Sequence, residues 1–394
     1  MKILIVGYSV RHIACSAARA GHEVIAADSF CDLDLEACSN GITLLPQPLD
    51  LTQAEILIQT YIEKFSPDGV VLGPGLEEAR VKGVSVLNNP PEKAALVSDK
   101  LWLAGWLEER GFPFIPTVES TETASFPAVI KPRKGAGGVG CKLVKKAADL
   151  KPEEEVKLEE GMIIQDWLSG TPASVSLIGT GRDAKAVAVN EQLIGAHWVG
   201  ANEFRYCGNI SPLEPSPLTS RKGTLQPEMA RMAEEIVSEL GLFGSNGVDF
   251  LLTENGPVVV EVNPRFQGSL DAVEMSTGKN IFQAHVDAFG GILPERPTPK
   301  KVAGRAILFA DENIKIDEPL TRWITGKDWI TDVPRPGSVI KRSDPVASVL
   351  ASGRGRAEVL DRLMARTTML RMATNPRAKG CLVDRPKNHQ ETTL

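Results

Sequence analysis

The chain has 394 residues, of which 42% are hydrophobic and 24% are charged, as in ordinary globular proteins. At about 100–200 residues per domain, this length predicts two to four domains that bury large cores without disulfides or metals. The formal net charge is −6, so we expect no nucleic acid as a partner. We also expect no membrane association, because no apolar run approaches the roughly 20 residues that span a bilayer.

The N-terminus does not resemble a secretory signal, because only four apolar residues, 3–6, precede Gly7. A signal peptide needs about 7–15 apolar residues. The six cysteines form no C-x-x-C pair and accompany no histidine cluster. This pattern predicts scattered reduced thiols and no zinc site, and we therefore expect a cytoplasmic protein.

The first 90 residues predict a parallel α/β layer. Residues 3–6 are typical of a strand buried on both faces, and further strands are predicted at 23–28 and 69–72. A helix with an alanine stripe lies after the first strand and ends at Gly21. Only Gly7 follows the first strand, whereas the dinucleotide-binding motif G-x-G-x-x-G needs three glycines. A nicotinamide oxidoreductase is therefore disfavoured.

Prolines divide the rest of the chain. Asn89-Pro90-Pro91 marks a boundary, and one helix is predicted from about residue 91 to 109. A second α/β region follows, and three prolines between residues 294 and 299 end it. The next segment, 301–350, is predicted to be β-rich, and a helix is predicted over 357–364.

A glycine-rich loop follows the strand predicted at 128–131. Lys131 ends this strand, and Lys134 opens a segment with four glycines: Gly135, Gly137, Gly138 and Gly140. Glycines let backbone N–H groups close onto phosphate oxygens, and the lysines supply counter-charge. The G-K-[ST] ending of a Walker A loop is missing. Taken alone, the segment is equally compatible with a flexible hairpin.

Oxygen ligands gather on a predicted hairpin whose turn lies at residues 254–257. Period-2 geometry puts Glu261, Asn263 and Arg265 on one face of the second strand. Asp249 lies on the neighbouring strand and is expected to face the same way. Carboxylate and amide oxygens suit Mg²⁺ that bridges to phosphates, and an arginine beside them would neutralise a moving phosphate. A solvated strand face remains the alternative for this segment alone.

Together these segments resemble the ATP-grasp superfamily over roughly residues 1–355. The resemblance implies that ATP and Mg²⁺, with Mn²⁺ as a substitute, are the cofactors. It implies that Lys100 and Lys131 contact phosphates and that residues 134–140 form a mobile loop over them. The implied magnesium ligands are Asp249, Glu261 and Asn263, and Arg265 is implied beside an acyl phosphate. The implied hinge around adenine is Gln165, Asp166, Trp167 and Leu168.

The resemblance also implies a fold and a domain order. The fold class is α/β, or α+β overall, with a parallel pre-ATP-grasp domain at the N-terminus and a β-rich C-terminal subdomain. The expected domains are 1–90 (pre-ATP-grasp), 91–295 (nucleotide- and magnesium-binding ATP-grasp), 296–372 (β-rich with a final helix) and 373–394 (flexible tail). This order is similar to biotin carboxylase and to archaeal carboligases such as tyramine–glutamate ligase and the ligase of pyrrolysine synthesis.

Two positions depart from the family pattern. Biotin carboxylases carry an acid that serves as the base for bicarbonate where this chain has Ser269, and a hydroxyl is no general base near neutral pH. Many relatives follow the hinge with Gly-x-Glu, which would hold ribose. Here the segment is Gly170-Thr171-Pro172-Ala173, so ribose is held in another way or less tightly.

The sequence therefore predicts an ATP-dependent carboxylate–amine ligase that forms an amide through an acyl phosphate and releases ADP and phosphate. Arg265, Lys131 and Asn263 are the expected catalytic residues. Small-molecule acids and amines are the expected partners, and a homodimer is compatible with the sequence. The alternatives are a biotin-carboxylase-like carboxylase and a nucleotide-binding protein without turnover.

Three residues are candidates for binding the substrate: Arg205, Tyr206 and Gln267. An arginine fork and a tyrosine hydroxyl can both hold a carboxylate, although a surface salt bridge is the alternative for Arg205. Arg11 follows the first strand, where ligands collect in α/β layers, so a substrate contact and a structural role both remain open for it.

Overall fold

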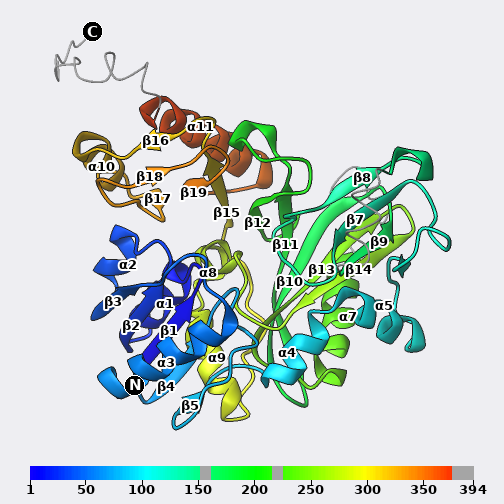
Figure 1. The fold of residues 1–394 in the computed structure, drawn as a ribbon, viewed down its shortest axis with the longest axis horizontal. Coiled ribbons are helices and arrows are strands. Elements are labelled where there is room, and N and C mark those ends of the chain that lie inside the picture. The colour runs from blue at the N-terminus through cyan, green and yellow to red at the C-terminus, as the bar shows by residue number, and fades with distance from the viewer. Residues whose placement is uncertain (151–160, 215–224, 375–394) are drawn as a thin grey trace.

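The computed structural model describes residues 1–150, 161–214 and 225–374, and Figure 1 shows their arrangement. The tail predicted at 373–394 lies outside the described residues from position 375 onward. Sheets of five, eight and four strands make up the body of the described chain, together with a small two-stranded ribbon. Among the residues described, no helix has the length and apolar character that crossing a membrane requires.

The N-terminal sheet is parallel throughout and has the strand order β3-β2-β1-β4-β5. Ile3 and Ile5 of β1 pack into one hydrophobic cluster, and Leu4 and Val6 pack into another on the opposite face. This burial on both faces explains the continuous apolar run at the start of the sequence. The strands are β1 (Lys2–Gly7), β2 (Glu23–Asp28), β3 (Gly41–Leu44), β4 (Gly69–Leu72) and β5 (Ser85–Val86).

Helices cover both faces of this sheet. Helix α3 (Leu51–Phe65) packs on one face and α1 (Arg11–Arg19) on the other. The α1 face also receives α8 (Leu270–Thr277) and α9 (Ile281–Phe289) from much later in the chain, and Phe282 of α9 is fully buried there. The N-terminal sheet therefore shares a core with the middle of the chain.

The single helix predicted over 91–109 is wrong, because the chain forms two helices there. They are α4 (Pro91–Val97) and α5 (Lys100–Glu109). The Asp99 carboxylate accepts hydrogen bonds from the backbone N–H groups of Leu101 and Trp102, both at 3.1 Å, and so caps α5. This cap leaves Lys100 as the first residue of α5.

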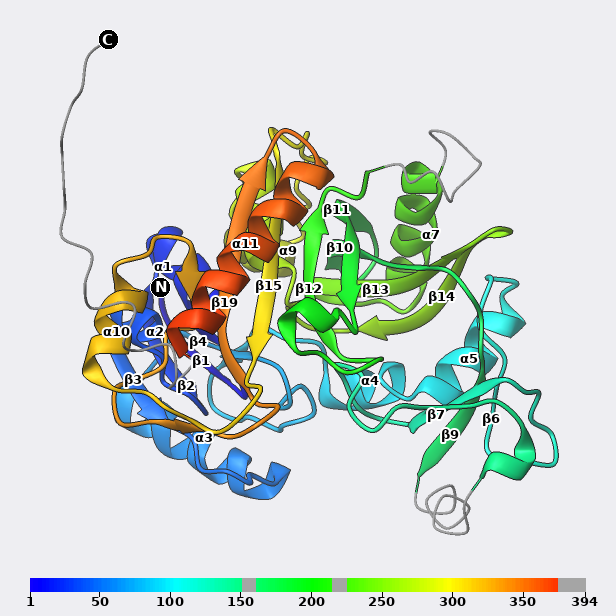
Figure 2. The ribbon, with the colours of Figure 1, turned by 90° about the horizontal axis from the view of Figure 1, so that it is seen from above.

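A four-stranded sheet with the order β6-β9-β7-β8 lies at the opposite end of the molecule from the N-terminal sheet (Figure 2). Its strands are β6 (Thr117–Val118), β7 (Ala128–Pro132), β8 (Lys142–Val144) and β9 (Met162–Asp166). The short 3₁₀ helix η1 (Ala147–Asp149) follows β8 in the sequence. A small hydrophobic cluster of four buried residues holds it: Ala128, Ile130, Val144 and Ile164. The glycine loop leaves this sheet between β7 and β8.

The eight-stranded sheet joins the middle of the chain to its C-terminal part. Its order is β14-β13-β10-β11-β12-β15-β19-β17, and α7 (Leu225–Glu239) packs on β10 and β11. The domain boundaries at 90, 295 and 372 stay predictions. The strands are β10 (Thr171–Thr180), β11 (Ala184–Ile194), β12 (Tyr206–Ser211), β13 (Phe243–Thr253), β14 (Gly256–Asn263), β15 (Val302–Phe309), β17 (Ile330–Thr331) and β19 (Pro345–Gly353).

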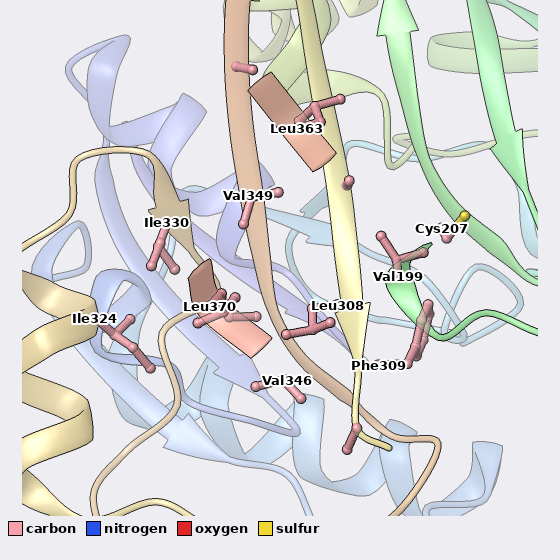
Figure 3. Close-up of a cluster of buried hydrophobic side chains, with 14 of the residues drawn as sticks. Val199, Cys207, Leu308, Phe309, Ile324, Ile330, Val346, Val349, Leu363 and Leu370 are labelled. Carbon is pink, nitrogen blue, oxygen red and sulfur yellow. The ribbon is translucent and has the colours of Figure 1, made fainter. Parts of the chain in front are cut away.

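The C-terminal part packs around one hydrophobic cluster, shown in Figure 3. Leu363 and Leu370 of α11 (Arg356–Thr374) lie in it together with Leu308 of β15 and Val349 of β19. The structure extends the helix predicted over 357–364 in both directions, because its apolar side chains remain buried to Ala373. The remaining elements are η2 (His197–Val199), β16 (Ile314–Lys315), α10 (Glu318–Thr325) and β18 (Val339–Ile340).

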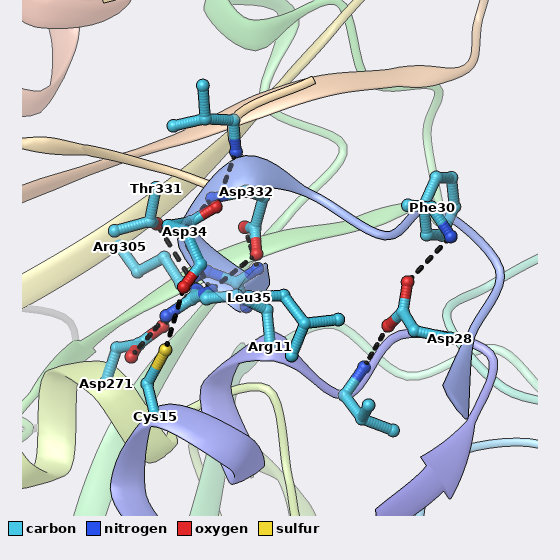
Figure 4. A network of polar contacts seen from close by, with 12 residues as sticks. Arg11, Cys15, Asp28, Phe30, Asp34, Leu35, Asp271, Arg305, Thr331 and Asp332 are labelled. Carbon is cyan, nitrogen blue, oxygen red and sulfur yellow. Dashed lines mark hydrogen bonds and ion pairs between the residues drawn. The ribbon is translucent and has the colours of Figure 1, made fainter. Parts of the chain in front are cut away.

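A buried network of ion pairs ties the N-terminal sheet to the C-terminal part (Figure 4). Arg11, only 3% exposed, donates to both carboxylate oxygens of Asp271 on α8, at 2.9 and 2.7 Å, and to Asp332 after β17, at 2.8 Å. Arg305 of β15 also donates to Asp332, at 2.8 Å. Asp34 of α2 (Leu33–Ala37) accepts from the backbone N–H of Asp332 at 2.9 Å. Arg11 therefore has a structural role, and the substrate contact left open for it is not supported.

The expectation of reduced thiols is wrong for one pair of cysteines. Cys15 of α1 and Cys38 after α2 form a disulfide, with their Cα atoms 5.2 Å apart. The packing of α1 against α2 brings together two residues whose sequence spacing predicts no pairing. Cys31, Cys141 and Cys207 are free, whereas Cys381 lies outside the described residues.

Candidate active site

The β13–β14 hairpin brings the four predicted polar residues together. Asp249 and Glu261 are direct partners across the two strands. Asn263 Nδ2 donates to Asp249 Oδ2 at 3.3 Å and to Glu261 Oε1 at 3.2 Å. Arg265 lies beyond the end of β14, but its Nη2 still donates to Asn263 Oδ1 at 3.2 Å. The arrangement on one face of the strands agrees with the period-2 pattern.

The charges of this set suit a cation. Burial and the neighbouring charge of Glu261 raise the pKa of Asp249 well above its usual range. Burial also raises the pKa of Glu261, but Lys100 and Lys131 outweigh that effect and the net shift is downward. Two carboxylates held side by side repel each other, and a bound cation would relieve this repulsion.

The donor set fits Mg²⁺ better than a metal held by protein ligands alone. In the part of the chain that the structure describes, no group of three or more His, Cys, Asp or Glu side chains could hold a metal. Mg²⁺ is usually bound by one or two carboxylates together with substrate phosphates and waters. Asp249, Glu261 and Asn263 therefore fit an ion that arrives with a nucleotide, and their role as ligands stays a prediction.

Two buried lysines face the carboxylates from other elements. Lys100 Nζ, at the start of α5, lies 3.5 Å from Glu261 Oε2 and donates to the carbonyl of Gly135 at 2.8 Å. Lys131 Nζ, on β7, donates to Gln165 Oε1 at 2.5 Å. Burial lowers the pKa of Lys131 to about 8, although the charge of Glu261 works in the opposite direction. Two buried ammonium groups that both act on Glu261 are suited to binding an anion such as a polyphosphate.

Replacing Lys131 with alanine is expected to weaken ATP binding. A charge-assisted hydrogen bond contributes about 1.5–3 kcal/mol, so the affinity should fall on the order of ten- to a hundredfold. Calorimetric titration of an ATP analogue with magnesium measures this loss. Lys146→Ala is the control, because this lysine is 73% exposed after β8. Equal nucleotide affinity in the Lys131 variant and the wild type would contradict the assignment.

The glycine loop, residues 134–140, contacts the start of β12 and the loop that follows β4. Tyr206 N donates to the carbonyl of Gly137 at 3.1 Å, and Lys134 Nζ contacts both carboxylate oxygens of Glu78, at 2.9 and 3.2 Å. Gly138 has φ +74°, and a Cβ there would collide with the backbone carbonyl of Phe204. Only glycine allows this close approach, so the loop can lie directly against the residues that precede β12.

The predicted adenine hinge begins beside Lys131. Gln165 is buried on β9, and its side chain bridges Lys131 and Thr117, whose Oγ1 accepts from Gln165 Nε2 at 3.0 Å. Trp167 is exposed, and its ring meets Phe204 edge-on with 6.1 Å between ring centroids. The roles of Gln165, Asp166, Trp167 and Leu168 in binding adenine stay predictions.

The three predicted substrate residues do not form one cluster of contacts. Arg205 stacks its guanidinium on the ring of Phe309, 4.4 Å from the centroid. Tyr206 donates to Asn209 Oδ1 at 3.3 Å, and burial raises its pKa above the usual range. Gln267 donates through Nε2 to the backbone carbonyl of Arg265, so it lies directly beside the β13–β14 set.

Two further glutamates, which no motif in the sequence singles out, reach this site. Glu77 and Glu78 follow β4, and Glu77 Oε1 lies 2.5 Å from Arg265 Nε while Glu78 Oε1 lies 2.9 Å from Lys134 Nζ. The topological switch point of the N-terminal sheet lies between β1 and β4, because the strands before β4 are added on one side of β1 and those from β4 onward on the other. Ligands bind at such switch points in open parallel sheets. Two adjacent acids in the loop that follows a strand at this point were the available signal.

The comparison with protein families agrees with this geometry. Residues 97–269 match the family model of the ATP-grasp domain, a stretch that includes Lys100, the glycine loop and the β13–β14 hairpin. The chain contains an ATP-grasp domain. The resemblance to this superfamily drawn from the sequence is thereby confirmed.

Similar proteins extend beyond that domain. The chain is 25% identical over 368 residues to an uncharacterized protein of Methanocaldococcus jannaschii, in an alignment that covers 89% of this chain and 88% of that protein. It is also 25% identical over 239 residues to the 3-methyl-D-ornithine–L-lysine ligase of Methanosarcina mazei, covering 59% of this chain and 58% of that enzyme.

A solved structure shows the same fold over most of the chain. The biotin carboxylase domain of 2-oxoglutarate carboxylase from Hydrogenobacter thermophilus, solved as a dimer with MgADP and bicarbonate, matches with a TM-score of 0.70. The sequence identity is 14%, and the match covers 92% of this chain and 88% of that one. The predicted mixed α/β fold class is confirmed. The prediction of an ATP-grasp ligase is confirmed at the level of the family.

Proposed function

We propose that the protein is an ATP-dependent carboxylate–amine ligase. The oxygen ligands of the β13–β14 hairpin face Lys100 and Lys131, and this convergence carries the proposal. A substrate carboxylate attacks the γ-phosphorus of ATP, ADP leaves, and an amine then attacks the acyl phosphate. The products are an amide and phosphate.

The protein contributes positions and charges to this reaction rather than a covalent nucleophile. Lys100 and Lys131 hold phosphate oxygens, and Mg²⁺ on Asp249, Glu261 and Asn263 would offset the charge of the triphosphate. Other residues act on the reacting groups. Arg265 neutralises the transferring phosphoryl group, and the glycine loop keeps water away from the acyl phosphate.

Two parts of the site are proposed to recognise the substrates and the nucleotide. Arg205, Tyr206 and Gln267 are proposed to hold the acid, and the segment from Gln165 to Leu168 is proposed to hold adenine. A small-molecule acid and a small-molecule amine are the proposed partners, and Mg²⁺ is the proposed metal.

The surroundings of Ser269 favour a ligase over a biotin carboxylase. Ser269 is buried at the start of α8, and its Oγ pairs with Ser176 Oγ at 3.1 Å. A buried hydroxyl bonded to another hydroxyl does not act as a base for bicarbonate near neutral pH. Amide formation does not depend on that base to the same degree, because a held amine can attack an acyl phosphate directly.

A screen of acid–amine pairs for ADP release tests the proposal. We expect a pair that releases ADP and forms the amide in a one-to-one ratio by mass spectrometry, with neither biotin nor bicarbonate present. Turnover with biotin and bicarbonate but with no acid–amine pair would show that the second half of the reaction is wrong. ATP binding without ADP release under any of these conditions would favour a nucleotide-binding protein without turnover.

A further inference from the structure

Glu77 and Glu78 are held firmly at the edge of the N-terminal sheet. Leu76 and Ala79, which flank them, are 5% and 1% exposed. The loop is also tied to the end of β1, because Tyr8 N donates to the carbonyl of Pro74 at 2.8 Å. Both carboxylates therefore reach from the topological switch point between β1 and β4 toward the ATP-grasp domain.

Glu77 forms an ion pair at the centre of the proposed reaction. Its carboxylate lies 2.5 Å from Arg265 Nε, and both side chains are mostly buried, at 18% and 14% exposure. The other nitrogens of Arg265 donate to the carbonyl of Phe266 at 3.1 Å and to Asn263 Oδ1 at 3.2 Å. Arg265 thus lies between the proposed magnesium ligands on one side and Glu77 on the other.

Arg265 has to give up part of its contact with Glu77 if it binds the transferring phosphoryl group. A guanidinium that binds phosphoryl oxygens has fewer N–H groups left for a carboxylate. A mostly buried carboxylate without a cation is costly, so Glu77 then needs a new positive partner. The second substrate supplies one, because an aliphatic amine arrives as an ammonium ion near neutral pH.

We propose that Glu77 binds the ammonium group of the amine substrate and takes one of its protons, an inference that rests on the proposed ligase function. The nitrogen lone pair released by this transfer forms the C–N bond with the acyl carbon. The bond between the acyl carbon and the oxygen that bridges to phosphorus breaks, and its electron pair leaves with phosphate. The second nitrogen proton leaves on that phosphate, and Glu77 returns its proton to water.

Hydroxylamine separates this role from a purely structural one. Hydroxylamine is uncharged near neutral pH and attacks acyl phosphates without first losing a proton, so it needs no carboxylate. In Glu77→Gln we expect amide formation with the ammonium-type amine to fall about a hundredfold or more, the range of general-base effects. Hydroxamate formation, with hydroxylamine in place of the amine, should stay within a few-fold of the wild type.

Two further variants sharpen the result. Glu77→Asp keeps the carboxylate and should restore part of the amide rate. Glu78→Gln removes the neighbouring carboxylate, which contacts Lys134. It should change the KM for ATP and leave the ratio of amide to hydroxamate as in the wild type.

The outcomes separate the two hypotheses. An equal loss of amide and hydroxamate in Glu77→Gln would mean that Glu77 only positions Arg265, and an unchanged amide rate would mean that it has no role. Either result overturns the inference while the ligase function stands. A wild type that forms neither product with any acid would overturn the ligase function itself.

Discussion

Glu261→Gln is expected to abolish turnover and to leave the fold intact. The substitution removes a charge that Lys100 and Lys131 share, and it takes an anionic ligand from the proposed magnesium site. Changes to residues that merely support metal ligands typically cost about 10–100-fold, so the loss of a ligand should cost at least on the order of a hundredfold. ADP release with a competent acid–amine pair at saturating magnesium measures the effect.

A matched control lies on the same hairpin. Glu254 is exposed at the turn between β13 and β14, and Glu254→Gln should leave both the rate and the thermal unfolding unchanged. The glutamine amide introduced by Glu261→Gln has nearly the shape of the carboxylate it replaces, so circular dichroism should show the same fold, with a lower melting temperature because the charge beside Lys100 is lost. A ligase rate within a few-fold of the wild type in Glu261→Gln would mean that the metal assignment is wrong.

Arg11→Met is expected to be the most destabilising of the substitutions considered. It removes the arginine that pairs with Asp271 and Asp332 and leaves both carboxylates buried with fewer cations. Breaking a buried ion pair from one side costs about 3–5 kcal/mol. Urea unfolding followed by circular dichroism should show this loss in the free energy of unfolding at neutral pH.

The pH dependence separates lost charge pairing from lost packing. Burial raises the pKa of Asp332, but Arg11 and Arg305 outweigh it and hold that pKa well below its usual range. The stabilisation is therefore present above about pH 4, the unfolded value, and is lost as the pH falls below it. As the pH falls below about 4, the difference in the free energy of unfolding between the wild type and Arg11→Met should become smaller.

Arg231→Met provides the comparison for the ion-pair network. Arg231 lies on α7 and is 71% exposed in its pair with Glu235, which is itself 47% exposed. An exposed pair contributes about 0–1 kcal/mol, so this variant should be nearly as stable as the wild type. Equal losses in the two variants, or a loss in Arg11→Met that does not depend on pH, would contradict the assigned role of the network.

Local patterns predicted the parts of the site that depend on neighbours in sequence. The alternation along β14 places Glu261 and Asn263 on one face, and the glycines after β7 leave that strand as a loop. Because these features follow from period and backbone freedom alone, they needed no knowledge of the tertiary structure. The break at Asp99 was missed, although its side chain is a good helix cap.

Contacts between distant residues were beyond such patterns. The partners of Arg11 lie 260 and 321 residues away, and the disulfide between Cys15 and Cys38 depends on how two helices pack. Glu77 shows the same limit, because its meeting with Arg265 requires the docking of the N-terminal sheet against the ATP-grasp domain. Only its position near the topological switch point between β1 and β4 could have indicated that Glu77 belongs to the site.

The long reach of Arg11 also bears on how the chain folds during its synthesis. Strands β1–β5 lie within the first 86 residues, so their sheet can form soon after it leaves the ribosome. Arg11 would stay without Asp332 until 321 more residues have been added. Closing so long a loop is slow, and the growing chain meanwhile exposes the apolar face that α8 and α9 later cover. The nascent N-terminal sheet therefore exposes part of its apolar face until the middle of the chain has been synthesised.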